Sequence, residues 1–264
     1  MDSHVLGRIA SQEAWHPLVR TLQRCARQVR ERGDLSYVVR TCADVVRVQC
    51  EQRFLVYHYA DVPVAWRALH TDAILLGGVA TLAMQKPTDV EARIRDLDVA
   101  LIVSGAPDRE ADVHMLLRAL QAYMPHDDSV HPRLVPDHIP LTQTNAARTV
   151  DEYAEAPSLS AFLRRCPHPS CPYGAPFVVR GFARDWPAMS RWRDPSDLCR
   201  RAGPGRVVPI EKGLSYTDET WGQGIVPWSD FLARIGWSSS ACEPLYLAQH
   251  TLHTQFPWLA HDII

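Results

Sequence analysis

The side chains best suited to binding or catalysis lie in the segment 211–221. Glu211, its first residue, ends a predicted strand. Tyr216, Asp218, Glu219 and Trp221 follow on a predicted loop. A carboxylate can accept two parallel hydrogen bonds from a guanidinium, and an indole face can stack on the same cation. The segment could therefore hold a basic side chain. A solvated acidic loop with one aromatic side chain turned inward explains the same residues, so both interpretations stay open.

A second polar set lies in residues 245–250, LYLAQH. On a strand, Tyr246 and Ala248 share one face, while Leu247 and Gln249 share the other. Tyr246 and Gln249 can therefore reach one site only if a bulge or the end of the strand lies between them. A core tyrosine whose hydroxyl bonds to the backbone is the alternative.

Histidine and carboxylate residues near the C-terminal end could suggest a metal site. Non-heme iron oxygenases hold iron with two histidines and one carboxylate on one face of the metal. His261 and Asp262 are adjacent, so on a strand they would point to opposite faces. We predict no metal ligand among them, nor at His250 or His253.

A cysteine- and histidine-containing stretch, residues 166–171 (CPHPSC), offers only three zinc ligands, whereas a structural zinc site needs four. Prolines interrupt this stretch, so we expect an irregular loop.

The elements that position these residues fall into two groups. Apolar residues at helical spacing predict helices over residues 18–29, 35–46, from Pro63 onward, 91–102 and 108–123. We expect Thr88 and Glu91 to form a capping box and Gly105 to end the fourth helix. In the fifth, we expect an inward face of Val113, Leu116, Leu117, Leu120 and Tyr123.

The pattern changes after residue 125. Prolines in residues 126–145 indicate a linker. Short helices are then predicted over residues 159–165, 186–192 and 226–235, the first capped by Ser158, and short strands over residues 177–179, 206–211 and 244–248. The sequence thus predicts an α+β protein with three parts: an all-α bundle over residues 1–125, a proline-rich linker over 126–150 and a strand-containing domain over 151–264.

Bulk properties limit the partners and the compartment. A net charge of −2 argues against a nucleic-acid-binding or membrane-binding surface. Seven scattered cysteines do not form a disulfide framework, and we find no signal peptide, so we expect a nuclear or cytoplasmic protein.

Three motifs in order carry a family resemblance: residues 176–192 (PFVVRGFARDWPAMSRW), 206–221 (RVVPIEKGLSYTDETW) and 246–263 (YLAQHTLHTQFPWLAHDI). Together they resemble the JmjC/cupin-type hydroxylases, which depend on Fe(II) and 2-oxoglutarate. The resemblance implies that Glu211, Tyr216 and Trp221 bind a basic side chain of a protein substrate. It also implies that the Tyr246 hydroxyl contacts the 2-oxoglutarate carboxylate and that Gln249 lies beside the reaction centre.

In the family, the iron ligands have the pattern H-x-D/E followed by a later histidine. This pattern lies beyond the stretch of the family that this chain resembles. We therefore expect the opening part of a jelly-roll barrel, truncated before the iron motif and incomplete, and no iron or 2-oxoglutarate bound by this chain alone. Two hypotheses remain. In the first, the chain is a fragment of a protein hydroxylase or lysine demethylase-type enzyme that acts on arginine or another basic residue and is inactive alone. In the second, it is a non-catalytic module whose helical half docks a partner protein, and the stripe at residues 116–123 is the candidate docking surface. Whether it is an enzyme stays open.

Overall fold

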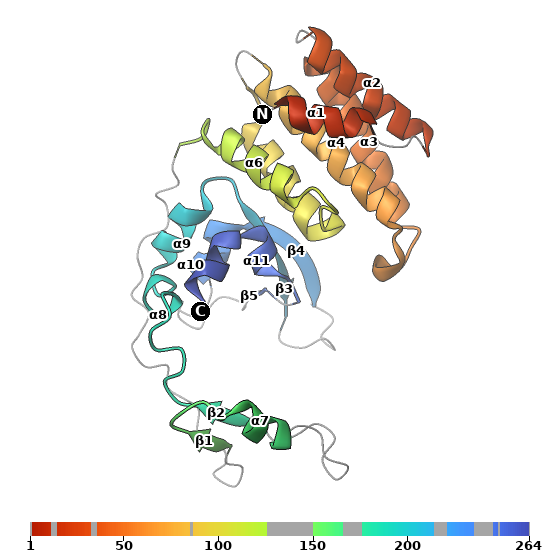
Figure 1. Ribbon diagram of the computed structural model, residues 1–264. Helices are drawn as coiled ribbons and strands as arrows, with labels where there is room; N and C mark the ends of the chain where they lie inside the picture. The colour runs from red at the N-terminus through yellow and green to blue at the C-terminus, as the bar shows by residue number, and fades with distance from the viewer. Residues whose placement is uncertain are drawn as a thin grey trace.

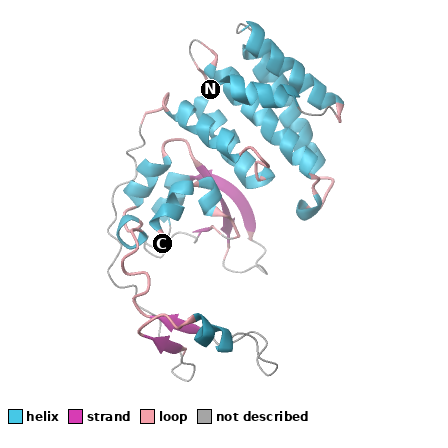
Figure 2. Ribbon diagram, in the orientation of Figure 1, coloured by secondary structure: helices cyan, strands magenta, loops and turns pink. Residues whose placement is uncertain are grey.

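The computed structural model describes residues 2–11, 15–32, 36–84, 87–125, 150–165, 176–213, 221–234, 245–247 and 249–263. Helices alone form the first half of the described chain, and helices with short strands form the second half (Figures 1 and 2). The fold is therefore α+β, as the sequence predicts. The linker predicted from residue 126 lies outside the described residues as far as residue 149. Among the described helices, none combines the length and the apolar character needed to cross a bilayer.

The helical half packs around α4, which is buried along most of its length. Residues 73–80 of α4 are wholly apolar, and the buried polar residues before them, His70, Thr71 and Asp72, have hydrogen-bond partners. A Cβ on Gly78 of α4 would lie 2.5 Å from Leu116 Cδ2, so this glycine lets α4 and α6 approach closely. The helices that surround α4 were predicted except for α1, and Pro63 precedes α4 as expected. Their bounds are α1 Asp2–Ser11, α2 Pro17–Arg32, α3 Ser36–Phe54, α4 Val64–Leu82, α5 Val90–Val99 and α6 Glu110–Gln121.

Two predicted apolar faces are only partly buried. On α3, Val39 and Val46 are buried, but Val38 and Val45 are 52% and 55% exposed. Apolar spacing over residues 35–46 predicts a single apolar face that holds all four valines, and this prediction is wrong, because neighbours in a helix lie about 100° apart. On α6 the predicted inward face is buried as far as Leu120, but Tyr123 is exposed, since the helix ends at Gln121.

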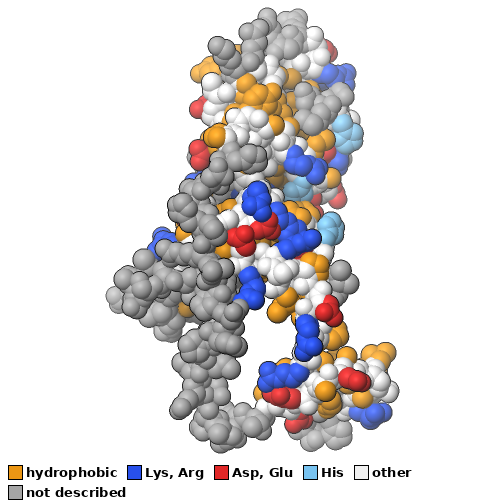
Figure 3. All heavy atoms as spheres, turned by 90° about the vertical axis from the view of Figure 1, so that its left-hand side faces the viewer, with side chains coloured by type: hydrophobic (Ala, Val, Ile, Leu, Met, Phe, Trp, Pro, Cys, Tyr) orange, Lys and Arg blue, Asp and Glu red, His pale blue; other side chains and the backbone are white. Residues whose placement is uncertain are grey.

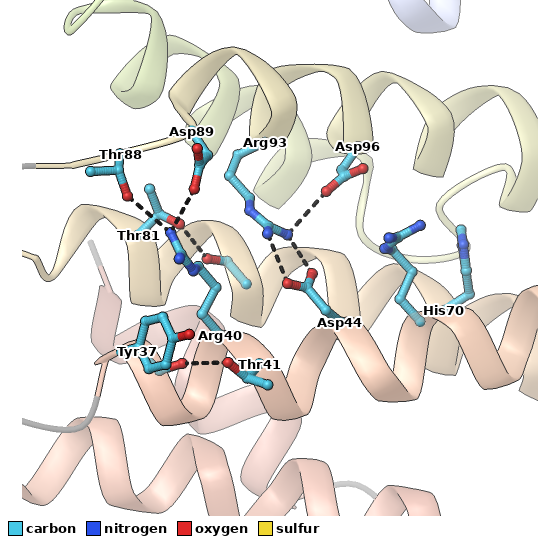
Figure 4. A network of polar contacts seen from close by, with 12 residues as sticks. Tyr37, Arg40, Thr41, Asp44, His70, Thr81, Thr88, Asp89, Arg93 and Asp96 are labelled. Carbon is cyan, nitrogen blue, oxygen red and sulfur yellow. Dashed lines mark hydrogen bonds and ion pairs between the residues drawn. The ribbon is translucent and has the colours of Figure 1, made fainter.

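The start of α5 differs from the predicted capping box. Asp89 is the N-cap residue, with φ of 58° and no side-chain capping bond. The Thr88 hydroxyl instead accepts a hydrogen bond from Arg40 of α3 at 3.1 Å (Figure 4). Arg93 also links α5 to α3 through Asp44, at 2.6 and 2.8 Å. The capping-box prediction is therefore wrong, because Asp89 rather than Thr88 is the N-cap residue and Arg40 of α3 binds the Thr88 hydroxyl.

The end of this helix follows the prediction. A π-helical turn, Ala100–Ser104, extends α5, and Gly105 closes it with φ of 70°. A positive φ of this size favours glycine, which explains why the chain turns at this residue.

The second half begins with a small lobe, in which β1 (Asp151–Tyr153) pairs in parallel with β2 (Phe177–Val179) beside α7 (Leu159–Arg165). Ser158 Oγ accepts a hydrogen bond from the Ala161 amide at 3.3 Å, so the predicted cap is confirmed. The space-filling view shows hydrophobic side chains exposed on this lobe among charged ones (Figure 3).

Two short helices, α8 (Ala188–Arg191) and α9 (Pro195–Ala202), lead from this lobe to a three-stranded antiparallel sheet. Its strand order is β4-β3-β5, with β3 Val207–Lys212, β4 Gly222–Pro227 and β5 Leu245–Tyr246. The sequence predicts β3 and α8 but neither β4 nor α9.

One predicted boundary in this sheet is wrong. Val226 was expected to begin a helix but pairs with Val208 in the sheet, and α10 runs over Trp228–Arg234. One face of the sheet packs on a second core. Val208 and Ile210 lie there with Trp228, and Phe256 comes from the segment that holds α11 (Leu252–Gln255) and the 3₁₀ helix Pro257–Asp262.

Candidate functional site

Glu211 lies near the end of β3, on the face of the sheet opposite the second core. Side chains alternate along a strand, so Val208 and Ile210 face the core and Glu211 faces the other way. Glu211 is half-buried, whereas Lys212, which follows it, is exposed. The strand therefore presents the Glu211 carboxylate on a partly sheltered surface.

Tyr246 lies directly across from Glu211 in the β3–β5 pairing. Side chains of directly opposite residues in an antiparallel pair share one face, with Cβ atoms about 4.5–5.5 Å apart. The Tyr246 side chain is 49% exposed. The register thus brings the predicted substrate-binding carboxylate next to the predicted cofactor-binding tyrosine, and the alternative of a core tyrosine is wrong.

Gln249 follows after β5 has ended at Tyr246, so the strand end that the sequence analysis required is present. Gln249 is exposed and adopts φ of 54°. A positive φ at a residue other than glycine is uncommon and occurs mostly at tight turns. The backbone thus leaves the strand direction between Tyr246 and Gln249, and strand alternation no longer sets the side on which Gln249 lies.

Trp221 is positioned by Gly213. Lys212 pairs with Gly222, so Gly213 and Trp221 meet where β3 and β4 diverge. Gly213 has φ of 103°, and a Cβ there would lie 3.1 Å from Trp221 Cα. Gln223 of β4 pairs with Glu211, and Trp221 comes two residues before Gln223. Trp221 therefore lies on the same side of the sheet as Glu211. Glu211, Trp221 and Tyr246 therefore share one face, which we call the Glu211 face.

The other residues predicted in the segment 211–221 lie outside the part of the chain that the structure describes. Tyr216, Asp218 and Glu219 lie in residues 214–220, and the cysteine- and histidine-containing loop lies in residues 166–175, all outside the described residues. Their roles stay predictions.

A buried polar network supports the Glu211 face from the helical half, and sequence reasoning missed it. Asp98 of α5 is fully buried and accepts hydrogen bonds from the Arg206 guanidinium at 2.7–3.0 Å. It also accepts from the Val207 amide at 2.9 Å and from Gln255 Nε2 at 2.8 Å. Gln255 Oε1 lies 2.8 Å from His250 Nε2. The network thus runs from α5 to the first residue of β3 and to the segment that follows Tyr246 and Gln249.

The signal for this network in the sequence is weak. Arg206 directly precedes the apolar start of β3 and Gln255 directly precedes Phe256, so each is a polar residue beside the core, where a buried polar group must find a partner. Their common partner, Asp98, is more than a hundred residues away in the chain, at 108 and 157 residues.

The acidic and histidine residues near residue 262 do not fit an iron centre. Asp262 is fully buried and accepts bonds from Arg201 and Arg191, each at 2.6 Å, and from Trp192 Nε1 at 3.0 Å. The hydrogen bond from Arg201, with those from Arg191 and Trp192, holds the pKa of the Asp262 carboxyl well below its usual range. Because the carboxylate is already neutralised by two guanidinium groups, a metal ion would have to displace them.

The same holds for the described chain as a whole. Among its described residues, no group of three or more histidine, cysteine, aspartate or glutamate side chains is arranged to hold a metal ion. No step of a reaction is therefore assigned to iron at these residues.

A cavity of about 340 Å³ lies between the two halves, on the α5 side of the sheet. Glu91 and Arg95 line it from α5, and Arg206 and Trp228 line it from the second half. None of Glu211, Trp221 and Tyr246 is among its lining residues. The cavity is therefore separate from the Glu211 face.

Comparisons with curated proteins identify relatives. The chain is 31% identical over 218 residues to Jumonji C domain-containing protein 5 of Drosophila melanogaster, covering 80% of this chain and 52% of that protein. It is 40% identical over 107 residues to Lysine-specific demethylase JMJ30 of Arabidopsis thaliana, covering 40% of this chain and 24% of that protein. It is 38% identical over 88 residues to Lysine-specific demethylase 8 of Danio rerio, covering 33% of this chain and 22% of that protein.

The chain thus spans about half the length of the first of these relatives and less of the others. No family model matches the chain. No solved structure matches it either.

Proposed function

We propose that the chain belongs to the JmjC-type family of its relatives and that the Glu211 face is the substrate-facing part of a protein-modifying JmjC-type oxygenase. In this proposal the sheet β4-β3-β5 is part of a jelly-roll barrel. The observation that carries the proposal is the register that sets Glu211 opposite Tyr246 with Trp221 on the same side.

The proposed substrate is a protein side chain that carries a positive charge, arginine in the first instance and lysine as the alternative. A half-buried carboxylate attracts a cation more strongly than an exposed one, because less water screens it. Glu211 would accept hydrogen bonds from the guanidinium, and the indole of Trp221 would cover its flat face. Tyr216 belongs to the same proposed set.

Tyr246 and Gln249 are proposed to face the cosubstrate, 2-oxoglutarate. A tyrosine hydroxyl can donate a hydrogen bond to a carboxylate, and the half-exposed Tyr246 is accessible to one. We propose that Fe(II) and 2-oxoglutarate bind to full-length members of the family and not to this chain alone. This chain alone is proposed to be inactive, because the residues nearest to an iron-ligand pattern, Asp262 and His250, are already bonded to other side chains.

The experiment is a binding titration of the full chain with a short peptide that contains one arginine. The matched peptide replaces arginine with citrulline, which keeps the shape of the side chain and removes its charge. We expect the arginine peptide to bind more tightly, and Glu211→Gln to weaken its binding by about tenfold to a hundredfold, since a charge-assisted bond is worth about 1.5–3 kcal/mol. Asp230→Asn, at an exposed acid of α10, serves as the control and should leave binding unchanged.

Two results would contradict the proposal. Equal affinity for the arginine and citrulline peptides would remove the role of charge. Unchanged binding by the Glu211→Gln variant would remove the role of this carboxylate. A separate incubation with iron, 2-oxoglutarate and the arginine peptide tests the proposed inactivity, and succinate formation above the blank would overturn it.

The second proposed function is a non-catalytic interaction module formed by the helical half. The stripe predicted for docking does not support it, because Leu116, Leu117 and Leu120 lie in the core.

A further inference from the structure

Two cysteine thiols from neighbouring helices meet in the helical half. The Cys25 thiol of α2 forms a side-chain hydrogen bond with Cys42 of α3. Helices α2 and α3 pack against each other along the same stretch (Figure 1). Both cysteines are free thiols in this structure. The sequence gives no sign of this contact, because the two residues lie on different helices.

The two thiols differ in their access to solvent. Cys25 is 5% exposed and lies in the core with Leu22 and Val29 of the same helix. Cys42 is half-buried and packs against this core from α3. A small oxidant in water can therefore reach the sulfur of Cys42 more easily than that of Cys25.

The environment of Cys25 keeps its thiol protonated. Burial, together with the neighbouring Cys42 thiol, raises the pKa of Cys25 to about 11, although the charge of Arg24 opposes this shift. A buried and protonated thiol reacts slowly with a reagent in solution, because the thiolate is the nucleophile. It can still react with a group that is held against it, since contact replaces a collision between two molecules. The sulfur of Cys42 is held in that position.

We propose that Cys25 and Cys42 are a redox-responsive pair, in which oxidation by a hydroperoxide closes a disulfide between α2 and α3. A disulfide needs an S–S bond of about 2.05 Å and Cβ atoms about 3.5–4.5 Å apart. Thiols that already touch can meet these limits by side-chain rotation while the helices stay in place. Helix α2 lies at the end of the helical half that is farthest from the sheet (Figure 1). The pair is therefore distinct from the Glu211 face and goes beyond the proposed substrate role.

The reaction has two steps, and hydrogen peroxide is the simplest oxidant of this class. The Cys42 sulfur attacks one peroxide oxygen, the O–O bond breaks, and the thiol proton leaves with hydroxide as water, so that Cys42 becomes a sulfenic acid. The Cys25 sulfur then attacks the Cys42 sulfur, the S–O bond breaks, and the second hydroxide leaves with the Cys25 proton as water. Each sulfur loses one electron, and the peroxide gains both.

Cys50 provides a matched comparison on the same helix as Cys42. It is fully buried, and burial raises its pKa to about 12. The charged neighbour that acts on it is the Glu51 carboxylate rather than a second thiol. Cys50 also lies about 12 Å from Cys42 along the helix axis, since each residue adds about 1.5 Å. We therefore expect Cys50 to stay reduced in the folded protein.

The test treats the full chain with hydrogen peroxide, alkylates the remaining thiols and maps disulfides by mass spectrometry of tryptic peptides. Trypsin releases Cys25 in residues 25–27 (CAR), Cys42 in residues 41–47 (TCADVVR) and Cys50 in residues 48–53 (VQCEQR). In the folded protein, the Cys25–Cys42 linkage should be at least tenfold more abundant than the Cys42–Cys50 linkage. Oxidation in urea should remove this preference, because the shorter loop between Cys42 and Cys50 then closes at least as readily. Dithiothreitol should reverse the linkage.

Variants separate the two steps. Cys25→Ala removes the second thiol, so dimedone, which labels sulfenic acids, should label Cys42 at least fivefold more than in the parent. Cys50→Ala is the matched control and should leave both the dimedone labelling and the Cys25–Cys42 linkage unchanged. Circular dichroism of each variant establishes that the helices are intact.

A thermal measurement tests whether the bond fits the native packing. The disulfide closes a loop between α2 and α3, so the oxidised parent should unfold about 5 °C above Cys42→Ser treated in the same way. Cys42→Ser is suited to this comparison because its position is only half-buried.

Four results would overturn the proposal. The first is the absence of the Cys25–Cys42 linkage after oxidation of the folded protein. The second is an equal ratio of the two linkages in the folded and the urea-treated samples. The third is an unfolding midpoint of the oxidised parent that is equal to or below that of Cys42→Ser. The fourth is a sulfenic or sulfinic acid that accumulates at Cys42 in the parent while Cys25 stays reduced.

Discussion

Replacement of Asp98 by asparagine tests whether the helical half stabilises the sheet that carries the Glu211 face. Asp98 is fully buried and is bonded to Arg206, Val207 and Gln255, all from the second half of the chain. Asparagine has almost the same volume, but it removes the negative charge. Its amide NH₂ group would also point at one of the donors that now bond to the carboxylate.

The expected loss of stability is large because Arg206 stays charged. The Arg206 side chain is 6% exposed, so water cannot replace the lost carboxylate. Removing one partner of a buried ion pair costs about 3–5 kcal/mol, whereas a whole domain is stable by only about 5–15 kcal/mol. Asp98→Asn should therefore lower the free energy of unfolding by about 3 kcal/mol or more.

Urea denaturation followed by tryptophan fluorescence measures this change. Trp228 is a suitable reporter, because it is buried against Phe256, with 5.1 Å between the ring centroids, and Phe256 in turn lies under the Arg206 guanidinium. The control is Asp197→Asn, which removes a pair with Arg200, whose side chain is 64% exposed. Such surface pairs contribute about 0–1 kcal/mol.

A double substitution, Asp98→Asn with Arg206→Met, shows whether the cost arises from the unpaired guanidinium. It should recover part of the stability that Asp98→Asn loses, since no buried charge is then left alone. A loss below about 1 kcal/mol for Asp98→Asn, or no recovery in the double variant, would refute the reasoning.

Two further predictions follow from the second half of the chain. Because bonds from Arg201 and Arg191 depress the pKa of Asp262, its stabilising effect is complete above the ordinary pKa of about 3.9 and is lost as the pH falls further. Urea midpoints of Asp262→Asn should therefore depend less on pH below about pH 4 than those of the parent, and an unchanged acid limb would contradict this. Gly213→Ala should destabilise the protein by about 1–3 kcal/mol, because its φ is 103° and its Cβ would press on Trp221. The control, Gly7→Ala in α1, meets no atom within 4 Å and should stabilise the helix by up to about 1 kcal/mol, as thermal unfolding of both variants can establish.

Sequence periodicity predicts the helices that bury one continuous apolar face. Helices α2, α4 and α6 lie where the spacing places them, because burial of such a face decides helix formation. The same reasoning predicts the wrong cap for α5, because Arg40, which is distant in the chain, binds both Thr88 and Asp89. It also misses β4, which is rich in glycine and is held by its pairing with β3 rather than by its own strand propensity.

For the candidate site as well, the sequence predicts which residues take part but not how they are arranged. Glu211, Trp221 and Tyr246 can be selected from their residue types and from the family resemblance. Their proximity cannot be derived from sequence alone, because it depends on a register between β3 and β5 that a one-residue slip would change. Asp98 carries no local signal at all, since it lies within a helix and its partners come from the other half of the chain.

This dependence has a consequence for the predicted division at residues 126–150. If residues 151–264 folded without the helical half, Arg206 would lose its carboxylate, and Thr254 and Ala202 would lose the side chains of His114 and Gln121 that bond to their carbonyl oxygens. Those groups lie next to the strand that carries Glu211, so the helical half helps to set the geometry of the Glu211 face. The helical array therefore supports the sheet through α5 and α6.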